Sequence, residues 1–357
     1  MIDRLETKPD FAQAMERVEA WFAGELLDRP PVRFTRHNAE FEAEPSGLDE
    51  AALRRRWFDV DYQVETFLES IKGRRFNGET FPVFWPNLGP DVYAAFYGCP
   101  LVYGEATSWA VHCVHEKSDI TALKYDTNCD YMRTLEALTK AALEIAPGRF
   151  LVGYTDLHPG IDTAVAWRGQ EPFCLDLYDD PEFARGLLDL AARDFGAIYD
   201  RFDGVLKAAG QPSVTWMGIP TPGKMHIPSC DFSSMLGAEH FEEFVYPELE
   251  RECRMMSHNV FHVDGKGVAR HLDRILELPG LQGIQWVQGV GDDEPIMQWV
   301  PLIREIQSRG KGVVVDLKPF ELGPFMGEIR PRGIYLCVGT GSEEEEQAII
   351  KMLESWR

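Results

Sequence analysis

The sequence has few positive charges, scattered cysteines and no long hydrophobic segment. Lys and Arg total 36 against 58 Asp and Glu, a formal net charge of −22, and such a surface repels nucleic acids and anionic lipids. No apolar run reaches the roughly 18 residues of a membrane span, and the first ten residues, MIDRLETKPD, are too polar for a signal peptide. The 7 cysteines show no paired framework, which is typical of reduced thiols. We therefore expect a cytoplasmic protein that binds neither nucleic acid nor membranes.

What the sequence does contain is the composition of a folded protein with a sizeable core. Of its 357 residues, 45% are hydrophobic and 26% are charged, which are ordinary fractions for a globular chain. The length suits one large domain as well as two, because α/β barrels reach this size as single domains. No internal repeat or low-complexity segment divides the chain.

Short apolar segments alternate with amphipathic segments of helical length, and Gly or Pro usually stands near the end of each. The strand-like segments are residues 31–36, 80–85, 149–156, 213–219, 259–264, 281–287, 312–317 and 333–339. Eight strands separated by helices predict a (β/α)8 TIM barrel, with extra N-terminal helices and a loop excursion at about 89–116 after the second strand. An open, doubly wound sheet is the alternative, but no glycine-rich phosphate loop follows the first strand.

Polar and aromatic side chains stand where the predicted strands end, and barrels of this type carry their active sites there. Asp156, followed by His158 and Asp162, is either an acid/base group or part of a helix cap. The segment 217–235 is either a lid or a connection in which Asp231 caps the next helix. Tryptophans near the strand ends suit a flat substrate, although core packing is their commoner use. The candidate substrate-binding residues are Arg36, His37, Trp85, Asn87, Tyr154, Trp216 and Gln285.

The stretch NVFHVDGKG places His262 and Asp264 on one face of a strand, because side chains alternate along a strand. Gly265 and Gly267 allow a sharp turn directly after them. With Cys337, the pair offers an imidazole, a carboxylate and a thiolate, which are zinc ligands, and a fourth position is left for substrate. The alternative is that His262 and Asp264 hydrogen-bond each other or the backbone, and that Cys337 is a buried, inert thiol.

Several longer motifs carry a likeness to a known family. They are ELLDRPPV, NLGPDVYAAFYG, DTAVAWRGQEPFCLDLYDDPE, DFSSMLGAEHFEEFVYPELE and FHVDGKGVARHLDRILELPGLQGIQWVQG, and the likeness runs from about Glu25 to the C-terminus. The chain resembles the uroporphyrinogen decarboxylase superfamily, which includes the decarboxylase of haem synthesis and methyltransferases that exchange methyl groups with corrinoid proteins. The resemblance implies one (β/α)8 barrel domain over residues 1–357 and a homodimer.

Within that superfamily the motifs favour the methyltransferases. Haem-pathway decarboxylases carry two arginines at the end of the first strand, whereas RHNAE keeps Arg36 and places Glu40 at the second position. The second strand ends in FWPNLGP, without the decarboxylase aspartate. A substrate with several carboxylates would therefore meet too few cations. In the methyltransferases a His-x-Cys pair and a later Cys bind zinc; His262 and Cys337 match the outer ligands, and Asp264 replaces the middle thiolate with a harder ligand.

The resemblance therefore implies a methyltransferase that moves a methyl group between a small substrate and the cobalt of a separate corrinoid protein. Its catalytic residues would be His262, Asp264 and Asp156, and zinc would be held by His262, Asp264 and Cys337. The chain has no recognisable corrinoid-binding domain, so the cofactor would come on the partner. One alternative is a decarboxylase-like lyase for a small carboxylated substrate, anchored by Arg36 without a metal. Another is a catalytically silent barrel that binds a small molecule or a partner.

Overall fold

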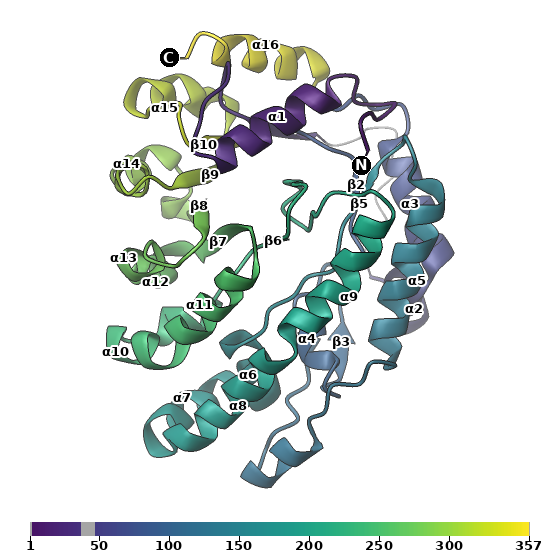
Figure 1. Cartoon of the computed structure of the whole chain (residues 1–357), viewed down its shortest axis with the longest axis vertical. Coiled ribbons are helices and arrows are strands. Elements are labelled where there is room, and N and C mark those ends of the chain that lie inside the picture. The colour runs from purple at the N-terminus through teal and green to yellow at the C-terminus, as the bar shows by residue number, and fades with distance from the viewer. Residues whose placement is uncertain (1, 37–46, 357) are drawn as a thin grey trace.

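The computed structural model describes residues 2–36 and 47–356. It is an α/β fold in which helices surround a curled parallel sheet (Figure 1). The strands are β1 (Val32–Arg36), β2 (Val83–Phe84), β3 (Leu101–Tyr103), β4 (Ser108–Ala110), β5 (Leu151–Val152), β6 (Met225–His226), β7 (His258–Asp264), β8 (Leu281–Val287), β9 (Gly312–Leu317) and β10 (Ile334–Thr340).

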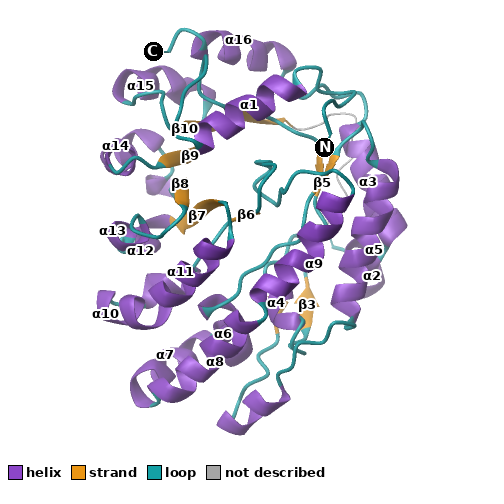
Figure 2. Ribbon diagram, viewed as in Figure 1, coloured by secondary structure: helices purple, strands orange, loops and turns teal. Residues whose placement is uncertain are grey.

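The helices follow the strands along the chain and lie outside them (Figure 2). They are α1 (Phe11–Phe22), α2 (Glu50–Phe58), α3 (Val60–Ile71), α4 (Val92–Ala95), α5 (Asp130–Ile145), α6 (Ile161–Arg168), α7 (Gln170–Asp179), α8 (Pro181–Arg193), α9 (Phe195–Ala208), α10 (Ala238–His240), α11 (Tyr246–Met255), α12 (Gly265–Ala269), α13 (Leu272–Ile275), α14 (Val300–Ser308), α15 (Leu322–Glu328) and α16 (Glu343–Leu353). None of them, within the described ranges, is long and apolar enough to cross a membrane.

The main sheet has the strand order β1-β10-β9-β8-β7-β6, and every pair in it is parallel. The first and last strands of the chain are therefore neighbours, as barrel closure requires on that side. A separate parallel pair, β2 and β5, stands beside this sheet, and β3 and β4 form an antiparallel hairpin in the predicted excursion. The described residues thus form a six-stranded curled sheet, and the closed ladder of eight strands stays a prediction.

The predicted strand at 213–219 was wrong. In that segment Ser213 forms an isolated antiparallel bridge with Thr221. Gly218 adopts a φ of 68°, which favours glycine, and closes a turn. Pro220 follows, and proline cannot donate a ladder hydrogen bond. The strand at this place in the sheet is instead β6, a few residues later, which pairs with β7.

Helix α1 closes the end of the sheet where the strands begin. The ring of Trp21 lies against Gly283 and Gly312, where an added Cβ would stand 2.6 and 2.7 Å from it. Its Nε1 donates to the carbonyl oxygen of Gly333 at 2.9 Å, and its ring meets that of Tyr335 edge-on at 5.6 Å. Because any side chain at these two strand positions would collide with the indole, glycine is required at both. Because one end is filled in this way, an open site has to lie at the other.

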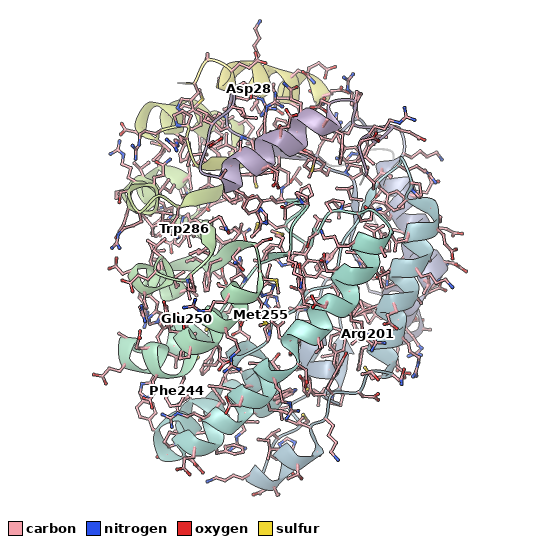
Figure 3. The ribbon with its side chains drawn as sticks, viewed as in Figure 1. Asp28, Arg201, Phe244, Glu250, Met255 and Trp286 are labelled. Atoms are coloured by element: carbon pink, nitrogen blue, oxygen red, sulfur yellow. The ribbon has the colours of Figure 1, made fainter. Side chains whose placement is uncertain are left out.

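The outward faces of the strands pack on the helical layer. Trp286 of β8 meets Trp299 with ring centroids 4.8 Å apart, and it lies inside the ring of helices (Figure 3). A second apolar cluster fills the interior of the curled sheet and includes Val260, Val314 and Tyr335, all fully buried. The interior is therefore a packed core up to the level of the carboxyl ends of the strands.

Candidate active site

A cavity of about 800 Å³ lies at the carboxyl-terminal ends of the strands. Its volume falls within the usual range for small-molecule sites. The walls come from the segments that follow β2, β4, β5, β6 and β7, so that the excursion contributes to them as predicted. Among the described residues that line it there is no Lys or Arg. The ionisable or hydroxyl-bearing lining residues are Asp91, His112, His158, Asp162, Ser229, Asp231, Ser234 and Asp264.

The central feature of the cavity is a histidine held by two partners. His158 Nε2 lies 2.9 Å from Asp156 Oδ1, and His158 Nδ1 lies 2.8 Å from Ser229 Oγ. Burial alone would lower the pKa of His158, but the charges of Asp156, Asp162 and Asp231 outweigh burial and raise this pKa to about 9. At neutral pH the ring is therefore an imidazolium that donates one N–H to Asp156 and the other to Ser229.

Ser229 connects this imidazolium to the cavity. Because its oxygen accepts the N–H of His158, its own hydroxyl hydrogen is directed to another acceptor. Ser229 lines the cavity and forms an isolated parallel bridge with His262, whose N–H donates to the carbonyl oxygen of Pro228 at 3.0 Å. The backbone of β7 therefore fixes the position of the hydroxyl, which can pass a proton from His158 to an atom bound in the cavity.

Carboxylates surround this hydroxyl. The two oxygens of Asp162 accept the backbone N–H groups of Asp231 and Phe232, each at 3.2 Å. Burial, followed by the charge of Asp231, raises the pKa of Asp162 to about 6. Asp91 accepts the N–H of Ala110 at 2.9 Å, and burial raises its pKa as well. Such a wall disfavours anionic substrates and suits neutral or cationic ones.

Three predicted residues come together below the cavity. His262 and Gln285 are register partners on β7 and β8, and His262 Nδ1 lies 2.7 Å from Gln285 Oε1. With that amide oxygen as the acceptor, Nδ1 of His262 is the donor of this hydrogen bond. The Trp216 ring stands edge-on to the imidazole, with 5.5 Å between centroids. His262 is thus oriented as a base or a ligand would be.

Asp264 and Cys337, which were predicted to bind zinc together with His262, lie in two different environments. Asp264 is exposed at the cavity wall, whereas Cys337 is buried and in register with Arg33 on β1 and Asp316 on β9. Burial raises the pKa of Cys337 to about 11, although the Arg33 guanidinium opposes the shift, so the sulfur is a thiol at neutral pH. Within residues 2–36 and 47–356, no three His, Cys, Asp or Glu side chains are arranged to hold a metal ion. The set as placed does not fit zinc.

Two predicted binding residues face away from the cavity. Arg36 Nε lies 3.3 Å from Glu346 Oε1, at the start of α16. Tyr154 is buried, and its hydroxyl donates to the carbonyl oxygen of Met225 at 2.8 Å. Both contacts join elements of the fold, and neither side chain lines the cavity.

The remaining predicted residues lie at the second strand or beyond the described ranges. Asn87 Oδ1 accepts the N–H of Gly89 at 2.7 Å, which shapes the start of the excursion. Trp85 is half-buried and also stands outside the lining of the cavity. His37 and Glu40 lie outside the described residues.

Sequence reasoning missed Asp91, His112 and Ser229. The first two belong to the excursion, which was predicted to shape the cavity, so their position was a usable signal even without a motif. His112 Nδ1 lies 3.0 Å from the carbonyl oxygen of Ala166 and is held in place by it. Ser229 carried no signal, since serine beside proline is common in any loop.

Comparison with known proteins shows the fold. No family model matches the chain, and no curated protein matches it. Among solved structures it is similar to a methyltransferase from Methanosarcina mazei, with a TM-score of 0.60 and 14% sequence identity. The similarity covers 95% of this chain and 97% of that one. The chain therefore shares its overall architecture, over almost all of its length, with that protein.

Proposed function

We propose that the protein is a methyltransferase that moves a methyl group between a small substrate and the cobalt of a corrinoid held by a separate protein. The observation that carries the proposal is the fold shared with a methyltransferase over 95% of the chain. A cavity with a proton relay at the carboxyl ends of the strands supports it. The superfamily resemblance of the sequence motifs points to the same reaction. Cytoplasmic location and a homodimer remain part of this proposal.

The chemistry required of this chain is delivery of a proton. The corrinoid supplies a nucleophilic cobalt that accepts the methyl group. When the bond between the methyl carbon and its oxygen, nitrogen or sulfur atom breaks, that atom keeps the electron pair and becomes basic. The hydroxyl of Ser229 donates its hydrogen to that atom and takes another from His158 Nδ1. His158 ends as a neutral imidazole that still donates to Asp156 through Nε2.

No step in this proposal uses a metal held by this chain, because the described ligand set does not converge. His262 contributes in a different way. Gln285 holds its ring in one orientation, and its backbone is bridged to that of Ser229, so that His262 helps to position the hydroxyl of the relay. Trp216 stands edge-on to the imidazole and restricts its rotation.

The second candidate is a decarboxylase-like lyase acting on a small carboxylated substrate. One observation favours it: Arg33, in register with Cys337, has an Nε that is buried without a hydrogen-bond partner among the described residues. Such a guanidinium can bind a carboxylate. In this reading Arg33 takes the anchoring role that the sequence suggested for Arg36, which is paired with Glu346. The carboxylate-rich cavity wall speaks against an anionic substrate.

The test uses free, reduced cobalamin in place of the partner protein. The protein is incubated with methoxy, methylamino, methylthio and methylsulfonium compounds, and demethylated products are followed by NMR together with the visible spectrum of the cobalamin. We expect transfer from at least one donor class. Carbon dioxide release from small carboxylic acids, with no methyl transfer, would favour the lyase.

The variant Ser229→Ala tests whether Ser229 delivers a proton or only helps to bind the substrate. Methyl ethers and amines need a protonated leaving group, so we expect their transfer to slow by about 10-fold to 100-fold, whereas a sulfonium donor needs no proton and should react at the parent rate. Ser234→Ala is the matched control, since Ser234 also lines the cavity but donates to the carbonyl oxygen of Asp231. Equal slowing of every donor class by Ser229→Ala would contradict the relay.

A further inference from the structure

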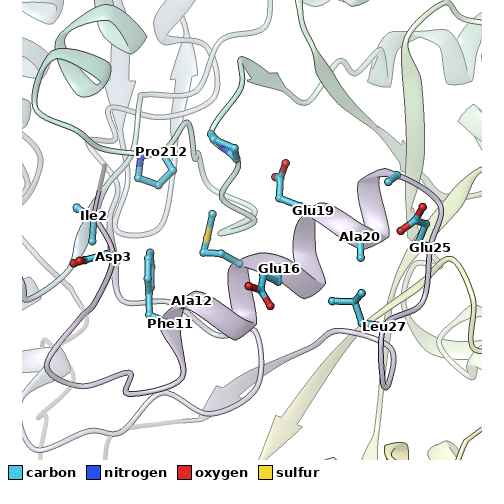
Figure 4. Close-up of a pocket in the computed structure, with 13 residues that line it drawn as sticks. Ile2, Asp3, Phe11, Ala12, Glu16, Glu19, Ala20, Glu25, Leu27 and Pro212 are labelled. Carbon is cyan, nitrogen blue, oxygen red and sulfur yellow. The ribbon is translucent and has the colours of Figure 1, made fainter.

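A second cavity lies beside α1, at the end of the sheet where the strands begin (Figure 4). Its volume is about 600 Å³, and its walls are the N-terminal segment, α1 and the connection around residues 212–222. Of its 13 lining residues, 9 are apolar and the other 4 are Asp3, Glu16, Glu19 and Glu25. The described lining includes no Lys, Arg or His. The cavity thus combines an apolar body with negative charge.

The sequence of α1 builds this cavity because the helix has two apolar faces. Ala14, Val18 and Trp21 are buried and pack onto the base of the sheet. A second row, one turn apart along the helix, contains Ala12 and Met15 and faces the cavity. Ordinary surface helices have a single apolar stripe. Met15 also packs against the core cluster and Ala12 is exposed, so the second stripe of α1 is only partly covered within the described part of the chain.

One acidic residue of the lining, Glu19, has a carboxylate oxygen that lacks a hydrogen-bond partner within the described ranges. Oε1 of Glu19 is buried and has no hydrogen-bond partner among the described residues. Its other oxygen lies 3.9 Å from His258 Nε2, too far for a hydrogen bond. Burial lowers the pKa of His258, so this ring does not neutralise the carboxylate at neutral pH. The Glu19 side chain as a whole is 37% exposed and lines the cavity, so a ligand N–H can approach the carboxylate on its exposed side.

We propose that this basal cavity binds a small organic ammonium ion, with its hydrocarbon body against Met15 and Phe11 and its nitrogen donating to Glu19. Figure 4 shows Phe11 and Glu19 on the side of α1 that faces Pro212. The volume suits a small molecule. The four carboxylates of this rim would face those of a second copy, which makes self-association through this particular face unfavourable.

The basal site is separate from the mouth cavity and does not rest on the proposed function. The packed interior around Val260, Val314 and Tyr335 lies between the two. A ligand at the base therefore changes the mouth only through the strands. Binding to each site can be measured independently of the other.

The test is calorimetric titration of the full chain with octylammonium, 1-octanol and octanoate, which share one hydrocarbon chain and differ in head-group charge. We expect 1:1 binding of octylammonium, binding of octanol at least about tenfold weaker, and no binding of octanoate. Equal binding of octylammonium and octanol would overturn the role of the carboxylates. Octylammonium-induced dimers, measured by sedimentation, would replace the proposal with an interface between copies.

Variants locate the site. Glu19→Gln should weaken octylammonium binding by about fivefold or more, and Met15→Trp should fill the cavity and abolish it. Glu239→Gln, on the exposed α10, is the matched control and should bind like the parent. Thermal melting confirms folding of each variant, and Ala12→Leu provides a second filling variant at an exposed position that lines the cavity. Unchanged affinity in both Glu19→Gln and the folded filling variants would remove the site.

Discussion

Two histidine–carboxylate pairs in this molecule have nearly equal hydrogen-bond lengths and opposite charge states. At the mouth, His158 and Asp156 are 2.9 Å apart, and the pKa of His158 is raised to about 9. In the core, His226 of β6 and Glu252 of α11 are 3.1 Å apart. Burial lowers the pKa of His226 to about 3 and raises that of Glu252 to about 8. At neutral pH the mouth pair is ionic, whereas in the core pair a protonated Glu252 donates to a neutral imidazole.

The difference teaches that surroundings, and not the pairing itself, decide where the proton is. His226 is 2% exposed and lies under the ring of Phe195, with centroids 4.8 Å apart, so desolvation dominates. His158 faces a cavity in which Asp162 and Asp231 add negative potential to that of Asp156. One pair holds a proton ready for transfer, and the other serves the stability of the core.

The largest expected effect is on catalysis at the mouth. His158→Gln removes the imidazolium and should slow methyl transfer from ethers or amines by about 100-fold or more. The measurement is the single-turnover rate with free, reduced cobalamin. Glu252→Gln, which keeps a hydrogen-bond donor in the core pair, should transfer at the parent rate. A His158→Gln rate close to that of the parent would place proton delivery on another residue.

The next effect is on stability in the core. Glu252→Ala leaves His226 unpaired and opens a small cavity, so we expect the free energy of unfolding to fall by about 2–4 kcal/mol. Urea unfolding followed by circular dichroism measures it. Glu250→Ala, two residues earlier on α11, removes a surface pair with Arg254 and should cost less than about 1 kcal/mol. Similar losses in the two variants would mean that the core pair contributes nothing specific.

Both histidine–carboxylate pairs should make the free energy of unfolding depend on pH. The folded-state pKa values of His158 and Glu252, about 9 and about 8, lie above the ordinary values of 6.5 and 4.5. The folded state therefore binds more protons, and these contributions weaken as pH rises through about 8 and 9. We expect the free energy of unfolding to fall on the order of 5 kcal/mol between pH 6.5 and 9.5, with about 3 kcal/mol from His158 and about 2 kcal/mol from Glu252.

Variants divide that loss between the pairs. In Glu252→Gln, the loss of stability that is centred below pH 8 should disappear. In His158→Gln, the loss of stability above pH 8 should disappear. His226 acts in the other direction: its lowered pKa means that its contribution is lost as pH falls from 6.5 toward 3. A stability curve that stays flat between pH 6.5 and 9.5 would show that neither pKa is raised.

The smallest effect concerns the surroundings of the mouth pair. Asp162→Asn keeps one of the two oxygens that accept backbone N–H groups and removes one of the charges that raise the pKa of His158. We expect that pKa to fall by up to about one unit, as followed by NMR titration of the histidine ring signals. Asp273→Asn, on α13, is the exposed control and should leave it unchanged.

The sequence predicted most strands correctly because their apolar runs are short and end at glycine or proline. The six strands of the main sheet include five of the predicted segments. The segment 213–219 misled because Val214, Trp216 and Met217 give it strand composition, whereas its following prolines and Gly218 impose turns. Composition over seven residues does not reveal where tertiary contacts bend the chain.

Within the candidate site, the choice of Arg36 was made from its place at the end of a strand. Alternation along β1 gives a different residue: Val32 and Phe34 are buried on one face, and Arg33 lies on the other, in register with Cys337. The alternation of side chains along the strand therefore pointed to Arg33 as the inward arginine. Arg36 lies on the same face as Phe34 and pairs with Glu346. Asp156 was predicted on its position alone, and its partner His158 stood two residues away in the same stretch. The contact of His158 with Ser229, 71 residues later, could not be predicted without the fold.

The indole of Trp21 at the base has a kinetic consequence. Within the described part of the chain, the indole and the packed interior lie between the two ends of the sheet, so the mouth cavity is not reached from the end where the strands begin, and its entrance lies on the opposite side. If the proposed corrinoid protein docks on this side, it would cover the entrance to the cavity. The small substrate would then have to bind before the partner, and the demethylated product would leave after it. Excess partner protein should consequently inhibit turnover by occupying the empty enzyme.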